Sequence, residues 1–170
     1  YQWHLDNTGQ SNFSGSTGTS TQDINVDGAI TTGYDGDGII VAILDSGLEL
    51  AHEDLSPNIV SGGSWDYAGN DNDPTNSSST GDHGTSVGGL TCAVGWNGKG
   101  GRGVSPACSL KGFNILSQYS TANAVASHGG ASYAQDVDVF NQSYGLTGLL
   151  GETTANATEE AQMLSAVTNL

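Results

Sequence analysis

Residues 81–89 read GDHGTSVGG, and residues 43–47 upstream of them read ILDSG. In the first segment, small residues follow a histidine. This pattern predicts a helix that begins at His83 and that a neighbouring backbone can approach closely. The second segment completes an apolar run over residues 38–44, GIIVAIL, which is typical of a buried strand in a parallel sheet. Asp45 therefore follows directly after a buried strand.

An aspartate and a histidine in these positions have a chemical use. Imidazole is the side chain whose ordinary pKa suits the activation of a serine hydroxyl near neutral pH. An anionic partner fixes its tautomer and stabilises its protonated form. In open α/β sheets, sites lie beyond the carboxyl ends of the strands, so Asp45 and His83 are candidate catalytic residues. Taken singly, residues 45–47 would be a simple turn and His83 a helix-terminal residue, but their order and the buried strand favour catalysis.

At these segments the chain resembles the subtilisin-like serine proteases, and among them the kexin/furin-like branch. Residues 41–47, VAILDSG, are similar to the family's aspartate motif, and residues 83–85, HGT, to its histidine motif. The likeness extends from residues 2–5, QWHL, to residues 143–145, SYG. It implies an α/β fold, the subtilisin-like three-layer αβα sandwich with a largely parallel central sheet. Residues 1–170 would be the amino-terminal part of the catalytic domain.

The resemblance also implies residues that this chain does not supply. In the family, the aspartate and the histidine are followed by an oxyanion-hole asparagine and then by the serine, which would both come after Leu170. The Gly-Thr-Ser tripeptides at residues 18–20 and 84–86 lie at the wrong places for the nucleophile. We therefore expect a serine endopeptidase that acts on a peptide or protein substrate and needs the remainder of the catalytic domain. A catalytically inactive pseudoprotease and a calcium-binding extracellular interaction module stay open as alternatives.

Composition and cysteine content limit the partners and the compartment. The chain has 18 acidic and 3 basic residues, a formal net charge of -15. Repulsion disfavours nucleic acid and anionic membranes as partners, whereas cations such as calcium are favoured. Cys92 and Cys108 can form one disulfide, or they are two reduced, buried thiols. A disulfide indicates an oxidising compartment, so we expect a secreted, extracellular protein.

The resemblance implies a Ca²⁺ site that joins Asp54 to the loop after the histidine helix. Asp54 matches a calcium-ligating aspartate of the family. Oxygen ligands from a glycine-rich loop suit a hard cation, because backbone carbonyls can converge there. The loop positions that match ligands are Val94, Asn97, Lys99 (through its carbonyl only) and Gly101.

A second Ca²⁺ site is implied in the acidic loop of residues 64–74, SWDYAGNDNDP. The kexin/furin-like proteases hold a cation in this region, and alternating Asp and Asn residues are typical of calcium loops. The ligands would be Asp66, Asp71 and Asp73. The alternative is a solvated acidic loop.

The rest of the chain alternates strands with helices. We expect strands over residues 109–116 and 136–142, and helices over residues 121–128 and 158–169. A short helix over residues 24–30 would be capped by Asp23. His128 is expected to be an ordinary residue at a helix end or on the surface.

The strand that emerges at Ser143, Tyr144 and Gly145 matches the segment that binds an extended peptide substrate in the family. Kexin/furin-like enzymes select basic residues with carboxylates around the substrate. Here Ser46 stands at the position of their second acid, and Thr80 and residues 146–148 replace further acids. Because Asp82 and Glu152 could compensate, we expect some preference for basic residues before the cut.

Overall fold

The computed structural model describes residues 2–11, 15–76, 81–145 and 156–168. Within these residues the strands are β1 (Ile40–Asp45), β2 (Trp65–Asp66), β3 (Ser109–Asn114) and β4 (Val139–Asn141). They form one sheet in the order β2-β3-β1-β4, and every pair is parallel. The predicted parallel sheet is therefore confirmed. Asp45 is the last residue of β1 and lies beside Asn114 at the end of β3.

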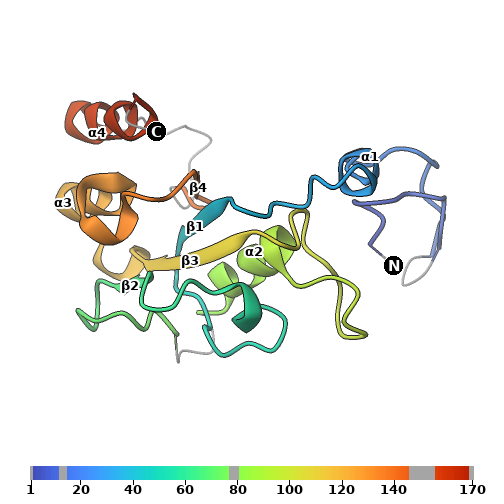
Figure 1. Cartoon of the computed structure of the whole chain (residues 1–170), viewed down its shortest axis with the longest axis horizontal. Helices are drawn as coiled ribbons and strands as arrows, with labels where there is room; N and C mark the ends of the chain where they lie inside the picture. The colour runs from blue at the N-terminus through green and yellow to red at the C-terminus, as the bar shows by residue number, and fades with distance from the viewer. Residues whose placement is uncertain (1, 12–14, 77–80, 146–155, 169–170) are drawn as a thin grey trace.

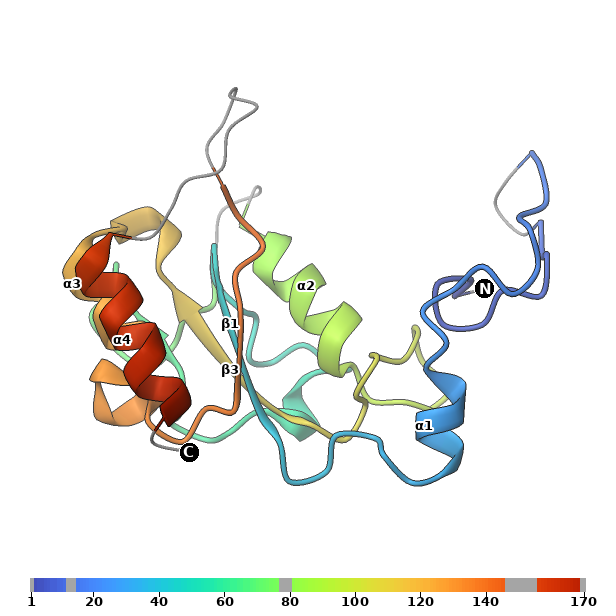
Figure 2. The same cartoon turned by 90° about the horizontal axis from the view of Figure 1, so that it is seen from above.

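Helices cover both faces of this sheet (Figure 2). On one face lies α2 (His83–Cys92), which contacts β1 and β3. On the other face lie α3 (Thr121–Val125), the π-helical turn Ala126–Gly130 that continues it, and α4 (Ala157–Thr168). The expected three-layer αβα arrangement is thus confirmed.

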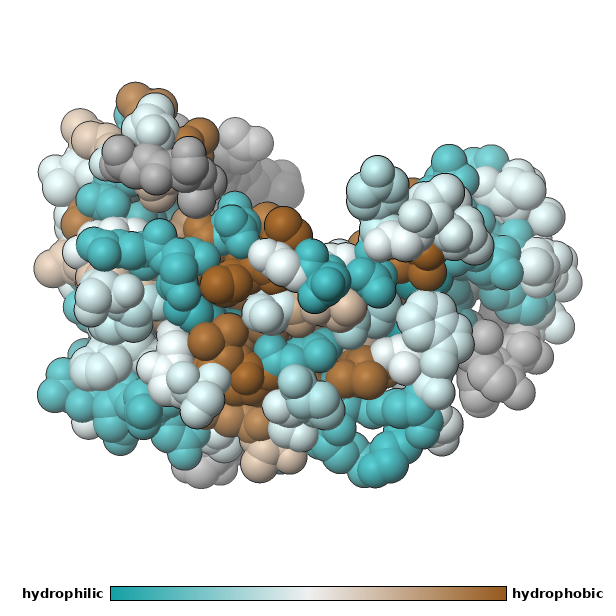
Figure 3. Space-filling view, viewed as in Figure 1, coloured by the Kyte–Doolittle hydropathy of each residue, from teal (hydrophilic) through white to brown (hydrophobic). Residues whose placement is uncertain are grey.

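The alternation of side chains along β1 gives each layer its own core. Ile43 packs toward α2 in a cluster with Leu48 and Leu110, whereas Leu44 packs on the opposite face with Phe113. All these side chains are fully buried. The hydrophobic residues on the face shown in Figure 3 gather over the middle of the molecule, where the strands lie in Figure 1. β1 is therefore buried on both faces, as its continuous apolar sequence predicted.

The N-terminal segment lies at the opposite end of the molecule from α4 (Figure 1). Its helix α1 is Asp27–Thr31, shorter and later than the expected helix over residues 24–30. Asp23 does not cap it, because its carboxylate accepts hydrogen bonds from the backbone N–H groups of Asn7 and Asn25. Short 3₁₀ turns complete the described elements: Ser56–Asn58, Leu116–Gln118 and Ser132–Ala134.

A disulfide joins Cys92, the last residue of α2, to Cys108, which directly precedes β3. Their Cα atoms are 5.8 Å apart, and both residues are buried. Of the two alternatives for these cysteines, the structure contains the bridge. It closes the loop that carries Asn97 and Lys99.

No membrane-spanning candidate was found among the helices of the described segments, since none combines sufficient length with sufficient apolar character.

The glycines of α2 allow this helix to approach β1 closely. A Cβ atom at Gly84 would overlap the carbonyl oxygen of Gly47 and lie 2.9 Å from the Cβ of Asp45. A Cβ at Gly88 would lie 2.8 Å from a methyl group of Leu48. At Gly89 a Cβ would meet nothing within 4 Å. The small-residue pattern of α2 is therefore required only on the side that faces β1.

This asymmetry predicts opposite effects for two identical substitutions. Gly84→Ala should lower the free energy of unfolding by about 1–3 kcal/mol, because the added methyl group forces α2 away from Gly47. Gly89→Ala should leave stability unchanged or raise it by up to about 1 kcal/mol, because alanine favours the helix. Chemical denaturation of the two variants measures the difference. Equal unfolding midpoints would contradict the close approach of α2 to β1.

Candidate active site

Asp45 occupies the carboxyl end of β1 and is completely buried. Its Oδ1 accepts a hydrogen bond of 2.6 Å from the backbone N–H of Ser46. The carboxylate is placed there because β1 is a central strand that ends at this residue and a turn at Gly47, with φ of 130°, follows. An ionised group in this position needs partners, since burial of an unpaired charge is costly.

His83 supplies the main side-chain partner. Its Nδ1 lies 2.8 Å from Oδ1 of Asp45. Because a carboxylate can only accept, Nδ1 carries the proton, and in the neutral ring Nε2 therefore carries the lone pair. The His83 side chain is 56% exposed, whereas that of Asp45 is 0% exposed. The pair thus presents a basic nitrogen to the outside while the anion stays inside.

The second carboxylate oxygen of Asp45 is also buried. Among the described residues, this Oδ2 has no hydrogen-bond partner. Both contacts to the carboxylate, from Ser46 and from His83, converge on Oδ1. The electrostatic link between Asp45 and His83 is therefore concentrated in one short hydrogen bond.

The candidate substrate strand lies directly after β4, at the edge of the described sheet. Ser143 and Gly145 are exposed, and Tyr144 is half-buried. Burial raises the pKa of Tyr144 to about 12, with smaller contributions from Tyr119, Glu159 and Asp45. The phenol is therefore neutral at physiological pH. Residues 142–145 continue the chain directly from β4 and are not part of a strand in the described sheet.

The expected residues of the first Ca²⁺ site lie together. The Oδ1 atom of Asp54 is 2.8 Å from the side-chain amide of Asn97, and the Asp54 carbonyl accepts a hydrogen bond from Val94. A Cβ atom at Gly100 would overlap Oδ2 of Asp54, so the glycine leaves room beside this carboxylate oxygen. The ammonium of Lys99 pairs with Glu53, so only its backbone is available to this loop. A buried carboxylate beside a bare loop backbone offers oxygen donors of the kind that suit a hard cation. The Asn97 amide, however, presents its NH₂ group to Asp54, and its Oδ1 accepts from the Lys99 N–H at 3.0 Å.

The second expected Ca²⁺ site is assembled only in part. A Cβ at Gly69 would lie 2.7 Å from a carboxylate oxygen of Asp66 and 3.0 Å from one of Asp71, so these carboxylates adjoin. Asp66 already accepts hydrogen bonds from Ala68, Gly69 and Asn114. The carboxylate of Asp73 instead accepts from the backbone of Thr75. Within the described segments, no group of three or more His, Cys, Asp and Glu side chains is arranged to hold a metal.

His128 lies at the end of the helical segment that follows α3, as one of the two sequence-based alternatives had it, but it is buried and not on the surface. Its Nδ1 donates to the Ala124 carbonyl at 2.7 Å, so its Nε2 accepts from the amide of Gln142. Burial lowers the pKa of His128, which keeps the ring neutral. Its burial was not predicted because the partner, Gln142, comes from the segment after β4. His128 connects α3 to the candidate substrate strand.

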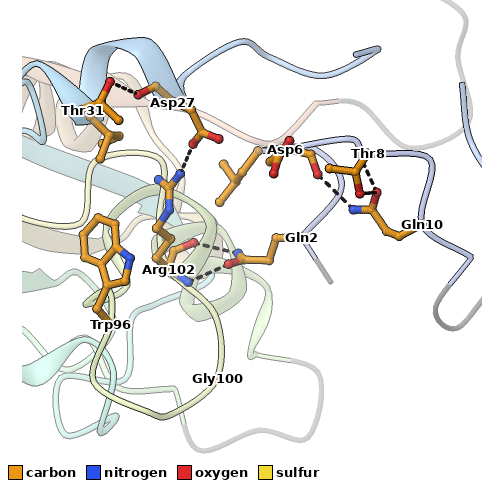
Figure 4. Close-up of a pocket in the computed structure, with 11 residues that line it drawn as sticks. Gln2, Asp6, Thr8, Gln10, Asp27, Thr31, Trp96, Gly100 and Arg102 are labelled. Carbon is orange, nitrogen blue, oxygen red and sulfur yellow. Dashed lines mark hydrogen bonds and ion pairs between the residues drawn. The ribbon is translucent and has the colours of Figure 1, made fainter. Parts of the chain in front are cut away.

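Gln2 contacts the segment that contains the candidate calcium loop, and no local pattern in the sequence indicates this contact. The Gln2 amide donates to the Arg102 carbonyl at 2.8 Å and accepts from the Arg102 N–H at 2.8 Å, and the Arg102 guanidinium pairs with Asp27 (Figure 4). These contacts line a cavity of about 650 Å³ beside the exposed Trp96. Neither Asp45 nor His83 is among the described residues that line it.

The acids that were considered for specificity are only partly described. Asp82 is exposed and directly precedes His83. Thr80, residues 146–148 and Glu152 lie outside the described residues.

Comparisons with known proteins agree with this geometry. The model of the Subtilase family (peptidase S8) matches residues 36–169. The chain is 38% identical to an extracellular serine protease of Aeromonas sobria over 165 residues, which is 95% of this chain and 26% of that protein. It is 31% identical to neuroendocrine convertase 2 of Bos taurus over 154 residues, 86% of this chain and 23% of that protein. The chain thus spans about a quarter of the length of these relatives.

The crystal structure of the Aeromonas sobria serine protease in complex with its chaperone has the same architecture. It matches 99% of this chain and 28% of the protease chain, with a TM-score of 0.86 and 36% sequence identity. The resemblance to subtilisin-like proteases, carried by the aspartate and histidine motifs, is thereby confirmed. The chain belongs to the Subtilase family.

Proposed function

We propose that this chain is the amino-terminal part of the catalytic domain of a secreted, calcium-stabilised serine endopeptidase. Asp45 and His83 are two members of its catalytic triad. The serine and the oxyanion-hole asparagine come from the remainder of the domain. The observation that carries the proposal is the 2.8 Å contact between Nδ1 of the half-exposed His83 and the fully buried Asp45. Family membership supports the same reading.

The mechanism follows from the tautomer of His83. Its Nε2 takes the proton from the serine hydroxyl as the oxygen attacks the carbonyl carbon of the peptide bond. The resulting imidazolium, held by Asp45, then gives that proton to the leaving amine as the C–N bond breaks. Water enters, loses a proton to Nε2, and releases the acyl group from the serine, which recovers its proton. Asp45 stays ionised throughout and stabilises the protonated ring.

The substrate is a peptide segment that pairs with the residues directly after β4. Ser143, Tyr144 and Gly145 are the residues that contact it, through their backbone groups. Their support is the position of this segment directly after β4 and the exposure of Ser143 and Gly145.

Secretion is supported by two observations. The disulfide between Cys92 and Cys108 is typical of proteins that fold in an oxidising compartment. The relative from Aeromonas sobria is an extracellular serine protease.

The bound cation is Ca²⁺, which would stabilise the fold rather than take part in the cleavage. At the first site it would be held by the carboxylate of Asp54, the side-chain oxygen of Asn97, and the carbonyls of Val94, Lys99 and Gly101. The fit rests on the buried carboxylate and on the space that Gly100 leaves beside it. A second ion in the acidic loop would be held by Asp66, Asp71 and Asp73.

The catalytic proposal predicts the effect of a substitution that keeps the shape of the site. Asp45→Asn in the complete protease should lower kcat by about 10⁴-fold, because an amide favours the wrong tautomer of His83 and cannot stabilise the imidazolium. Asp37→Asn, the same change in an exposed turn, is the matched control and should alter kcat less than twofold. A serine-directed fluorophosphonate should label the wild-type protein. Full activity of the Asp45 variant would exclude this triad, and a wild-type protein without labelling or hydrolysis would favour a pseudoprotease or a binding module.

The calcium proposal predicts a stability difference that depends on Asp54. At a calcium concentration of 100 times the dissociation constant, the ion should add about 2.7 kcal/mol to the free energy of unfolding. Asp54→Asn should abolish most of this gain, whereas Asp37→Asn should preserve it. Thermal unfolding with calcium and with EDTA provides the comparison. An EDTA effect of equal size in the two variants would place the stabilising ion elsewhere.

The specificity proposal is a preference for basic residues before the cleaved bond. Its support is the net charge of -15, the exposed Asp82 beside His83, and the similarity to a neuroendocrine convertase. Peptides that differ only in a dibasic or an apolar pair before the cut should show a higher kcat/KM for the dibasic one. Equal values would remove the preference without affecting the catalytic proposal.

A further inference from the structure

Ser46, the residue after Asp45, binds the backbone on both sides of His83. Its hydroxyl donates to the Gly81 carbonyl at 3.1 Å and accepts from the Gly84 N–H at 3.3 Å. Its own backbone N–H donates to the same carboxylate oxygen of Asp45 that His83 contacts. One residue is therefore connected to the anion and to both flanks of the imidazole.

The contact to Gly84 replaces an ordinary helix cap. The first N–H groups of a helix lack partners within it and are usually satisfied by a side chain just before the helix. Asp82 occupies that position before α2, but its side chain makes no capping hydrogen bond. The Ser46 hydroxyl, which comes from the turn after β1, takes the Gly84 N–H instead. The start of α2 is thus fixed to the strand that carries Asp45.

The turn that contains Ser46 is fixed by hydrogen bonds to residues 74 and 76. The side-chain amide of Asn76 donates to the Ser46 carbonyl at 2.7 Å, and the Leu48 N–H donates to the Pro74 carbonyl at 3.0 Å. A Cβ at Gly81 would overlap the Asn76 side chain, so this amide also packs against the segment that leads into α2. Ser46 therefore has a fixed backbone from which its hydroxyl can orient a neighbour.

We propose that Ser46 is a positioning residue: its hydroxyl fixes the first turn of α2 against the end of β1 and so keeps Nδ1 of His83 on Asp45. This inference rests on the proposed function of the pair. It also gives a structural role to residue 46, the position at which the kexin/furin-like proteases carry a second acid. Both hydrogen-bonding directions of the hydroxyl are occupied by backbone groups, and a carboxylate has no proton to donate to the Gly81 carbonyl.

The test compares three substitutions in the complete protease. Ser46→Ala should lower kcat by about 10- to 100-fold, since a small misplacement of a catalytic group has an effect of this size. KM should change much less than kcat, because the hydroxyl bonds to the Gly81 carbonyl and the Gly84 N–H and not to residues 143–145. Ser46→Thr keeps the hydroxyl and should retain kcat within about threefold of the wild-type value. Ser86→Ala is the matched control, because its hydroxyl donates to the carbonyl of Asp82, the residue just before α2, and makes no hydrogen bond with β1 among the described residues.

A second readout separates this inference from the catalytic proposal. The proton on Nδ1 of His83, hydrogen-bonded to a carboxylate, should give a low-field proton signal in NMR spectra of wild type, Ser46→Thr and Ser86→Ala. The signal should be lost or broadened in Ser46→Ala. This comparison holds even if the wild-type protein cleaves nothing, in which case the proposed function fails while the positioning inference stands.

An unchanged kcat and an unchanged signal in Ser46→Ala would overturn the inference. A Thr variant as impaired as the Ala variant would do the same, since the hydroxyl would then not be the determinant. If Ser46→Ala does not fold, the Thr variant decides alone: retention of the signal and of kcat supports the inference, and their loss refutes it.

Discussion

The hydrogen bond between His83 and Asp45 is the interaction on which the site depends. A completely buried carboxylate with one oxygen lacking a partner among the described residues is unfavourable unless its charge is stabilised locally. The Nδ1–H of His83 and the N–H of Ser46 provide that stabilisation at a single oxygen. The same bond sets the tautomer of the ring and directs Nε2 outward. One hydrogen bond therefore both stabilises the buried charge of Asp45 and sets the tautomer that acid–base chemistry at His83 needs.

The strand and helix layers of the fold fix the positions of Asp45 and His83 relative to each other. β1 is central and buried, which fixes the end of the strand and hence Asp45. Helix α2 approaches this end without side-chain bulk at Gly84, and the disulfide fixes its other end to the start of β3. The candidate calcium loop lies inside that disulfide-closed segment. Stability of the loop and orientation of His83 are thus linked through one helix, whose far end the disulfide holds.

The sequence predicted the parts that depend on local pattern. The apolar run before Asp45 and the small residues after His83 each specify their element within a few residues. It failed where a partner comes from a distant segment: Asp23 binds Asn7 instead of capping α1, and His128 is buried against Gln142. The role of Ser46 belongs to the same class, because its hydroxyl meets residues about 35 positions later.

The most direct test of the central claim is a crystal structure of the complete protease after reaction with a serine-directed phosphonate. The oxygen of the labelled serine should lie within about 3 Å of Nε2 of His83. Nδ1 of the same ring should remain hydrogen-bonded to the buried Asp45. A label on a serine far from this ring, or a His83 turned away from Asp45 in the reacted protein, would contradict the assignment of these two residues.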